Sequence, residues 1–67
     1  MNISVVIPVF NSAGILPELL ARLEPVMKKA TNEFEVILVN DGSPDSSWEA
    51  IEGLSKKYQW LKGINLL

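Results

Sequence analysis

The sequence predicts an α/β fold in which three parallel strands alternate with two helices. Two nearly continuous apolar runs rich in β-branched residues, at positions 3–10 and 33–40, have the pattern of strands in a parallel sheet. Apolar residues recur at helical spacing after each run, and a third apolar run closes the chain at 60–67. The order strand–helix–strand–helix–strand favours one sheet with right-handed crossovers.

The first run, I-S-V-V-I-P-V-F at 3–10, predicts a strand that is buried on both faces and not an alternating edge strand. Pro8 cannot donate a hydrogen bond to a sheet ladder. We therefore expect it to mark the point where the strand stops pairing and turns outward. The N-S-A-G segment that follows supplies turn and helix-capping residues.

Residues 15–29 have the apolar stripe of an amphipathic helix. Its apolar positions are Leu16, Leu19, Leu20, Leu23, Val26 and Met27. Pro17 fits the first turn, where a missing backbone N–H costs nothing. Pro25 lies further along, and we expect it to kink the helix or to end it early.

The second strand, E-F-E-V-I-L-V-N at 33–40, leads into a loop and a second helix. Trp48, Ile51, Leu54 and Tyr58 mark one face of this helix, and Ser46 to Glu49 matches the S-x-x-E capping box. With the last strand at 60–67, the expected architecture is a βαβαβ, three-stranded parallel, Rossmann-like half-domain. The aromatic residues near these elements are expected in the core or in oligomer contacts.

Composition excludes several classes of protein. With 67 residues the chain has room for one small domain, and it has no cysteine and no histidine. Disulfides, zinc–thiolate sites and a histidine general base are therefore excluded. The net charge is −2, and the basic residues form no patch, which argues against nucleic-acid binding.

The same composition places the chain in the cytoplasm. No apolar run is long enough to span a bilayer, and no signal-peptide pattern follows Met1. We therefore expect a soluble, intracellular chain. Its end, K-G-I-N-L-L without a polar tail, favours residues 1–67 being the N-terminal portion of a longer protein.

Candidate binding residues follow the first two strands. In open α/β sheets ligands bind outside the carboxyl ends of the strands, so the loops P-V-F-N-S and N-D-G-S-P-D-S-S can converge on one crevice. Phe10 offers a flat face, Asn11 offers a donor and an acceptor, and the Asp41 carboxylate can accept from N–H and O–H groups. Gly42 lets a backbone approach closely.

The second loop also has a purely structural interpretation. Asp and Ser cap helices, Gly takes positive φ and Pro stiffens turns, so the loop taken alone does not decide between capping and ligand binding. Asp45 is expected at the start of the helix and not at the ligand. Neither G-x-G-x-x-G nor G-x-x-x-x-G-K-[ST] is present, which excludes those two nucleotide-binding motifs.

Taken together, S-V-V-I-P-V-F-N and, about thirty residues later, F-E-V-I-L-V-N-D-G-S-P-D-S-S resemble the N-terminus of family-2 glycosyltransferases with the GT-A fold. The resemblance covers nearly the whole chain. The L-P-E-L-L-A-R-L-E-P-V stretch is most similar to the subgroup that moves sugars onto dolichyl or undecaprenyl phosphate.

The resemblance implies a role for each loop residue. In such enzymes this half of the domain binds the nucleotide of a UDP- or GDP-linked sugar donor. The implied nucleotide-sugar-binding residues are Pro8, Phe10, Asn11, Asp41, Gly42 and Ser43, with Asp41 accepting from the base. The chain departs from the family at Asn40, where an acidic residue is frequent, and at Phe10-Asn11-Ser12, where other members offer a glutamate to the ribose.

The resemblance also says what these residues lack. The family's D-x-D metal site, its catalytic base and its acceptor pocket have no counterpart in residues 1–67. We therefore expect no catalytic residue and no metal ligand in this chain. Mg²⁺ or Mn²⁺ is expected only in the full-length parent, which acts on a lipid-phosphate or glycan acceptor and lies in the cytoplasm or at the cytoplasmic face of a membrane.

A second hypothesis concerns the chain by itself. A three-stranded sheet has two exposed edges, and the last strand is apolar. The alternative is a small non-enzymatic α/β module that self-associates through these edges.

Overall fold

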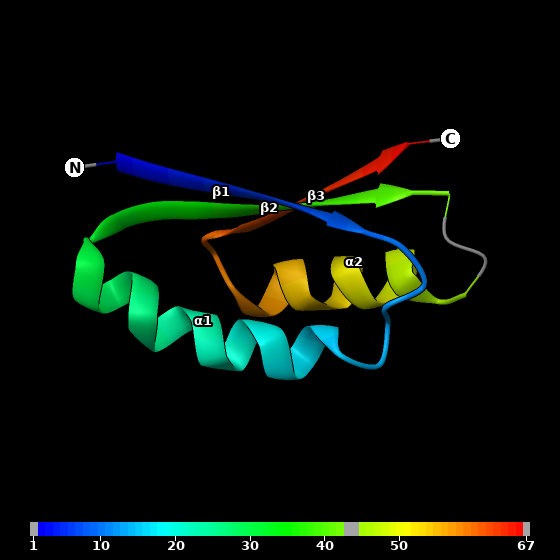
Figure 1. The fold of residues 1–67 in the computed structure, drawn as a ribbon, viewed down its shortest axis with the longest axis horizontal. Helices are drawn as coiled ribbons and strands as arrows, with labels where there is room; N and C mark the ends of the chain where they lie inside the picture. Colours follow the sequence, from blue (N-terminus) through cyan, green and yellow to red (C-terminus); the bar gives the residue numbers. More distant parts are fainter. Residues whose placement is uncertain (1, 43–44, 67) are drawn as a thin grey trace.

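A computed structural model describes residues 2–42 and 45–66 of the chain (Figure 1). These residues form β1 (Asn2–Val9), α1 (Leu16–Ala30), β2 (Glu33–Asp41), α2 (Ser47–Lys57) and β3 (Leu61–Leu66). The predicted βαβαβ order is confirmed, with element bounds within one or two residues of those expected from the hydrophobic pattern.

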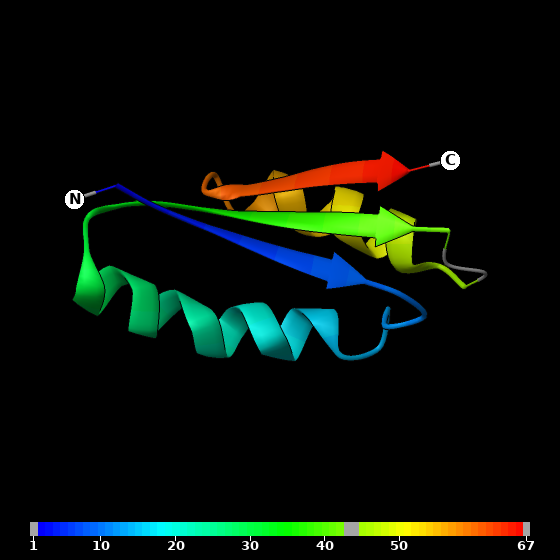
Figure 2. The same cartoon turned by 45° about the horizontal axis from the view of Figure 1, so that its top comes forward.

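The three strands form one parallel sheet in the order β1-β2-β3. The chain moves in one direction across the sheet: β2 is added beside β1, and β3 is added on the far side of β2. Because parallel crossovers are right-handed, both helices then lie on one face of the sheet, as Figures 1 and 2 show. The carboxyl ends of the strands meet at one edge, beside the amino ends of both helices.

The core lies between the sheet and the two helices. Its buried residues are Val9, Leu16, Leu20, Val36, Leu38, Ile51 and Leu61. The partly buried aromatic residues Trp48, Tyr58 and Trp60 pack against this cluster. Their expected place in the core is confirmed.

The opposite face of the sheet carries no helix among the described residues. Burial therefore alternates along β1 from exposed to intermediate, and β1 is an edge strand. The expectation that this strand is buried on both faces was wrong for this part of the chain. The physical reason is that two right-handed crossovers that run in the same direction along the sheet, in the order β1-β2-β3, place both helices on one face.

The expectation that strand pairing stops at Pro8 was wrong, and Pro25 does not end its helix early. β1 continues to pair through Pro8, which lies opposite Val39, and Val9 lies opposite Asn40. An edge strand tolerates proline because only one of its sides must form the ladder. α1 likewise continues past Pro25 to Ala30, while Pro17 lies in its first turn as expected.

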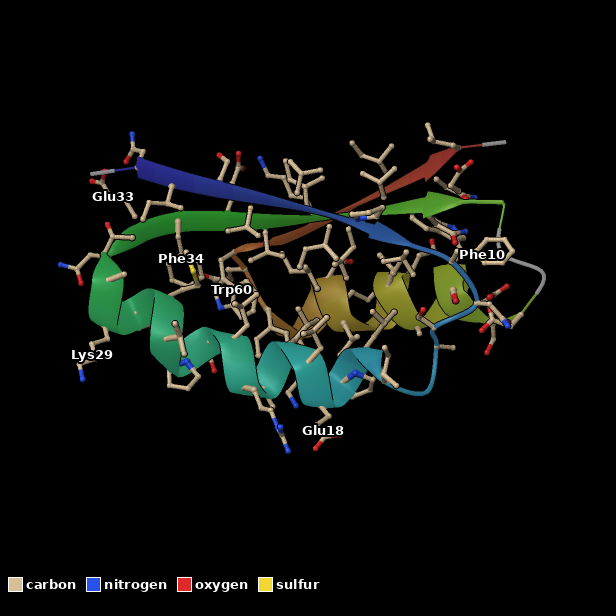
Figure 3. The ribbon with its side chains drawn as sticks, viewed as in Figure 1. Phe10, Glu18, Lys29, Glu33, Phe34 and Trp60 are labelled. Atoms are coloured by element: carbon tan, nitrogen blue, oxygen red, sulfur yellow. The ribbon has the colours of Figure 1, made fainter. Side chains whose placement is uncertain are left out.

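Aromatic side chains close the other end of the molecule. The ring of Trp60 lies 5.2 Å from that of Phe34 and 4.7 Å from that of Tyr58, centroid to centroid. The Trp60 indole N–H also donates to Glu24 Oε2 on α1 at 3.0 Å. Figure 3 shows Phe34 and Trp60 at the end of the sheet remote from Phe10. This cluster joins the last turns of α1 to the beginning of β3.

The uncovered face divides into a polar and an apolar half. Near the amino ends of the strands, Glu35 accepts from Ser4 Oγ at 2.9 Å and pairs with Lys62 Nζ at 3.1 Å. The hydrogen bond from Ser4 is the largest single cause that lowers the pKa of Glu35, and the hydrogen bond and the charge of Lys62 lower it further. The apolar half carries the exposed side chains of Val6, Ile64 and Leu66.

Candidate functional site

The two loops expected to bind a ligand lie side by side at the carboxyl edge of the sheet. Residues 10–15 connect β1 to α1, and the segment after Asp41 connects β2 to α2. Because β1 and β2 are neighbours in the sheet, their loops leave it next to each other (Figure 2). The fold thus brings together two segments that are about thirty residues apart in the sequence.

Side-chain alternation separates Asn40 from Asp41. Asn40 faces the helices and is 4% exposed, whereas Asp41 is exposed on the opposite face of the sheet. Pro8 shares that face with Asp41, since its pairing partner Val39 is two residues from Asp41. The acidic group and the proline therefore lie toward the same side of the carboxyl edge.

Phe10 and Asn11 form the first loop next to this edge. The Phe10 ring is 62% exposed, which leaves its flat face open to a ligand (Figure 3). Asn11 has a positive φ of 51°, and Gly42, across in the second loop, has a φ of 66°. Asparagine and glycine are the residues that adopt this left-handed conformation at least cost. Each loop thus makes a sharp turn directly beside the strand it follows.

The last predicted site residue, Ser43, lies outside the described residues. The other five predicted site residues lie in one region of the molecule, on the loops or at the strand ends beside them. Their role in binding a nucleotide stays a prediction.

Asp45 and Ser47 connect the two loops. Ser47 is fully buried, and its backbone N–H and hydroxyl both donate to Asp45 Oδ1, at 3.1 Å and 2.6 Å. The other carboxylate oxygen, Oδ2, accepts from the Ala13 N–H of the first loop at 3.3 Å. The Ser12 N–H donates to Ser47 Oγ at 3.0 Å. We call these four hydrogen bonds the loop clamp.

The loop clamp confirms Asp45 at the start of the helix and corrects the predicted capping box. Ser46 makes no side-chain capping hydrogen bond, and α2 begins at Ser47. The Asp45 carboxylate bonds the Ser47 N–H instead, in the local pattern that aspartate adopts two residues before an amide. The hydrogen bond from Ser47 is the main reason why the pKa of Asp45 is lower than usual, and the bond from Ala13 lowers it further.

Sequence reasoning missed the amide pair under this edge. Asn40 Nδ2 donates to Asn65 Oδ1 at 3.0 Å across β2 and β3, while Asn40 Oδ1 is buried without a hydrogen-bond partner. Each asparagine occupies a core-facing position on its strand, directly opposite the other. The sequence did hold a signal for Asn40. It is a polar residue that continues the alternating series of buried positions, Val36 and Leu38, along an apolar strand.

The described residues at this edge form no metal site. Within residues 2–42 and 45–66, no three His, Cys, Asp or Glu side chains gather closely enough to hold a metal ion. A shallow cavity of about 400 Å³ lies at the opposite end of the sheet, between the first residues of β1 and β2. Neither helix in the described ranges has the length and apolar character needed to cross a bilayer.

Known proteins are similar to this chain over most of its length. The family model described as glycosyl transferase family 2 matches residues 4–66. The undecaprenyl-phosphate 4-deoxy-4-formamido-L-arabinose transferase of Pseudomonas fluorescens strain Pf0-1 is 46% identical over 50 residues, which cover 75% of this chain and 15% of that protein. The transferase of the same name from Pseudomonas savastanoi pv. phaseolicola strain 1448A / Race 6 is 44% identical over 55 residues, or 82% of this chain and 16% of that protein.

The similarity is thus confined to a small part of these relatives. A third transferase of that name, from Pseudomonas fluorescens strain SBW25, is 48% identical over 50 residues and is again covered over 15% of its length. These names agree with the expected similarity to enzymes that move sugars onto polyprenyl phosphates. The match along nearly all of the βαβαβ unit shows that the chain belongs to glycosyl transferase family 2.

Proposed function

We propose that this chain is the nucleotide-sugar-binding part of a glycosyltransferase that moves a sugar from a UDP- or GDP-linked donor to a lipid-phosphate or glycan acceptor. One observation carries the proposal: Phe10 directly follows β1 and Asp41 ends the neighbouring strand β2, so both lie at the carboxyl edge of a parallel sheet. Ligands of open α/β sheets bind at this edge.

The chemistry of the edge suits a nucleoside. The imide N–H of uracil or the ring N–H of guanine needs an acceptor, and the exposed Asp41 carboxylate offers one. The exposed face of Phe10 can stack on the base, and Pro8 would form a wall beside it. Gly42 leaves room for the base or ribose close to the backbone, since no atom of the described residues, apart from its chain neighbours, lies within 4 Å of where a Cβ would be.

The remaining predicted residues would complete the contact. Asn11 can donate to or accept from the ribose hydroxyls, and Ser43 would line the second loop. In sugar transfer, an acceptor oxygen bonds to the anomeric carbon as the bond to the nucleotide's phosphate breaks. We assign no catalytic residue for that step to residues 1–67, which supply binding and orientation only.

The described residues do not fit the divalent metal that such enzymes commonly use. They contain no group of carboxylates that could hold Mg²⁺ or Mn²⁺. We assign the metal and the acceptor site to parts of a longer protein, whose relatives are named for undecaprenyl phosphate. A lipid-phosphate acceptor would place that protein at the cytoplasmic face of a membrane.

Calorimetry with UDP and GDP on the full-length protein tests the proposal. Asp41→Ala should weaken binding of the preferred nucleotide by about tenfold or more, because the base N–H loses a charged acceptor. Glu33→Ala is the matched control, since Glu33 is an exposed carboxylate at the opposite end of the same strand (Figure 3). Equal affinity of the wild-type protein and Asp41→Ala would overturn the assignment.

Self-association is a second candidate function, favoured by the bare face of the sheet. Val6, Ile64 and Leu66 expose apolar side chains there, and β1 and β3 form the two edges of the sheet within the described residues. We expect residues 1–67, produced alone, to associate through this sheet, and Val6→Lys to reduce the association. A clean monomer in light scattering at high concentration would rule this out.

A further inference from the structure

We propose that Asp45 and Ser47 are positioning residues, which hold the two loops of the nucleotide site in register through the loop clamp. The inference rests on the proposed function of this edge and adds two residues that contact no ligand. It follows from where the four hydrogen bonds lie relative to Phe10 and Asp41.

Each candidate binding segment is held at both of its ends. Phe10 and Asn11 follow Val9, which is paired with Asn40 in the sheet, and they precede Ser12, whose N–H donates to Ser47. Only Phe10 and Asn11 lie between these two fixed points. The second loop starts from β2, which is paired on both sides, and reaches the clamp again at Asp45.

The clamp uses every polar atom of its two side chains. Ser47 Oγ gives its hydrogen to Asp45 Oδ1 and can then accept only, which it does from the Ser12 N–H. The two oxygens of Asp45 divide between the loops, with Oδ1 bonded to Ser47 and Oδ2 bonded to Ala13. Asparagine in place of Asp45 lacks the second acceptor oxygen, and alanine in place of Ser47 lacks the hydroxyl, so neither variant can make all four bonds.

Ser47 is the buried half of the clamp, whereas Asp45 is exposed. Ser47 has no exposed surface, so water cannot replace its hydroxyl as the partner of the Ser12 N–H. Loss of the hydroxyl would leave the Ser12 N–H without a hydrogen-bond acceptor if the loop kept its position. The loop would satisfy it by moving outward, and Phe10, two residues away, would move with it.

The positioning role predicts that loss of the clamp weakens nucleotide binding and leaves the rate of the chemical step unchanged. Misplaced base-binding residues weaken the ground state and the transition state equally, so KM for the donor rises while kcat at saturating donor stays unchanged. KM for the acceptor should not change. A residue needed only for folding would instead lower the amount of active enzyme and would leave both KM values as they are.

The experiment compares three variants of the full-length protein by calorimetry with UDP or GDP, whichever the wild type binds. Ser47→Ala and Asp45→Ala should each raise Kd by about fivefold to tenfold. Asp45→Asn keeps an oxygen for Ser47 and loses only the acceptor for the Ala13 N–H, so its effect should be about half as large on the free-energy scale. Ser46→Ala is the control, since this neighbouring exposed serine makes no side-chain capping bond, and it should bind as the wild type does.

A double-mutant cycle separates positioning from general destabilisation. If Ser47 acts through the placement of Phe10, Ser47→Ala should cost much less affinity in a Phe10→Ala background than in the wild type. Additive losses would contradict the proposal. Should Ser47→Ala fail to fold, the cycle is run with Asp45→Asn, in which most of the clamp is retained.

The possible results distinguish this proposal from the function on which it rests. No binding of either nucleotide by the wild type, or full binding by Asp41→Ala, would overturn the proposed function. A different result would overturn only the positioning role of the loop clamp. In that result Asp41→Ala weakens nucleotide binding, whereas folded Ser47→Ala and Asp45→Ala bind the nucleotide as the wild type does.

Discussion

Gly63 of β3 lies directly against Ile51 of α2. A Cβ at this position would collide with Ile51 Cγ2 and would lie 3.1 Å from Trp48 Cζ3. The absence of a side chain therefore lets α2 approach the sheet, and the fully buried Ile51 fills the space. The close approach also sets the position of the amino end of α2, where Ser47 begins the helix.

Gly63→Ala should lower the free energy of unfolding by about 1–3 kcal/mol, the usual cost of overpacking a core. The matched control is Gly53→Ala inside α2, where an added Cβ meets no atom within 4 Å. That change should stabilise by up to about 1 kcal/mol, because alanine favours helix over glycine. Urea denaturation of both variants measures the difference, and equal stabilities would show that α2 is free to shift.

Two adjacent leucines of α1 test where its apolar face lies. Leu20 is fully buried, whereas Leu19 is 37% exposed. Leu20→Ala should cost about 2–5 kcal/mol through lost burial and a residual cavity. Leu19→Ala should cost far less. Thermal or urea unfolding measures both losses, and similar losses at the two positions would contradict the assignment of Leu20, and not Leu19, to the buried face of α1.

The contact between Trp60 and Glu24 predicts a pH-dependent contribution to stability. The hydrogen bond from Trp60 is the largest cause that lowers the pKa of Glu24, and Lys28 lowers it further. A carboxylate whose folded pKa is depressed stabilises the fold above its unfolded pKa, and this stabilisation is lost as pH falls through the folded pKa. Trp60→Phe removes the donor and should therefore be more destabilising at neutral pH than in acid.

Thermal unfolding of the wild type and Trp60→Phe, from neutral pH to below about pH 4, measures this effect. Glu24→Gln is the companion variant, because it keeps an acceptor for Trp60 but cannot ionise. Its midpoint should depend less on pH than that of the wild type. A constant gap between the wild type and Trp60→Phe at all pH values would mean that Trp60 contributes only packing.

The order of elements could be predicted because local patterns encode it. Continuous β-branched runs, one helical stripe and a loop rich in turn residues each act over a few neighbouring residues. Pro17 was correctly expected in a first turn for the same reason. Pro8 shows the limit of local rules, since the outcome there depends on whether its strand lies at an edge.

The candidate site was predicted in part. Asp41 and Phe10 could be proposed from their places after two strands, because parallel strands end at the same edge. The loop clamp could not, since Asp45 and Ser47 reach Ser12 and Ala13 across more than thirty residues of sequence. The predicted capping box does not form, since Ser46 is exposed and makes no side-chain capping bond. Asp45 lies at the start of the helix instead, with Oδ1 accepting from the Ser47 N–H and Oδ2 accepting from the Ala13 N–H.

The amino-acid sequence by itself determined the alternation of strands and helices, the membership in a transferase family and the polar residues available at the strand ends. Only the tertiary structure decided which face of the sheet stays bare, which of Asn40 and Asp41 is exposed, and which side chain joins the two loops. Local propensity acts between neighbours along the chain, whereas these three outcomes depend on the hand of the crossovers and on strand register, which arise only when distant segments pack together.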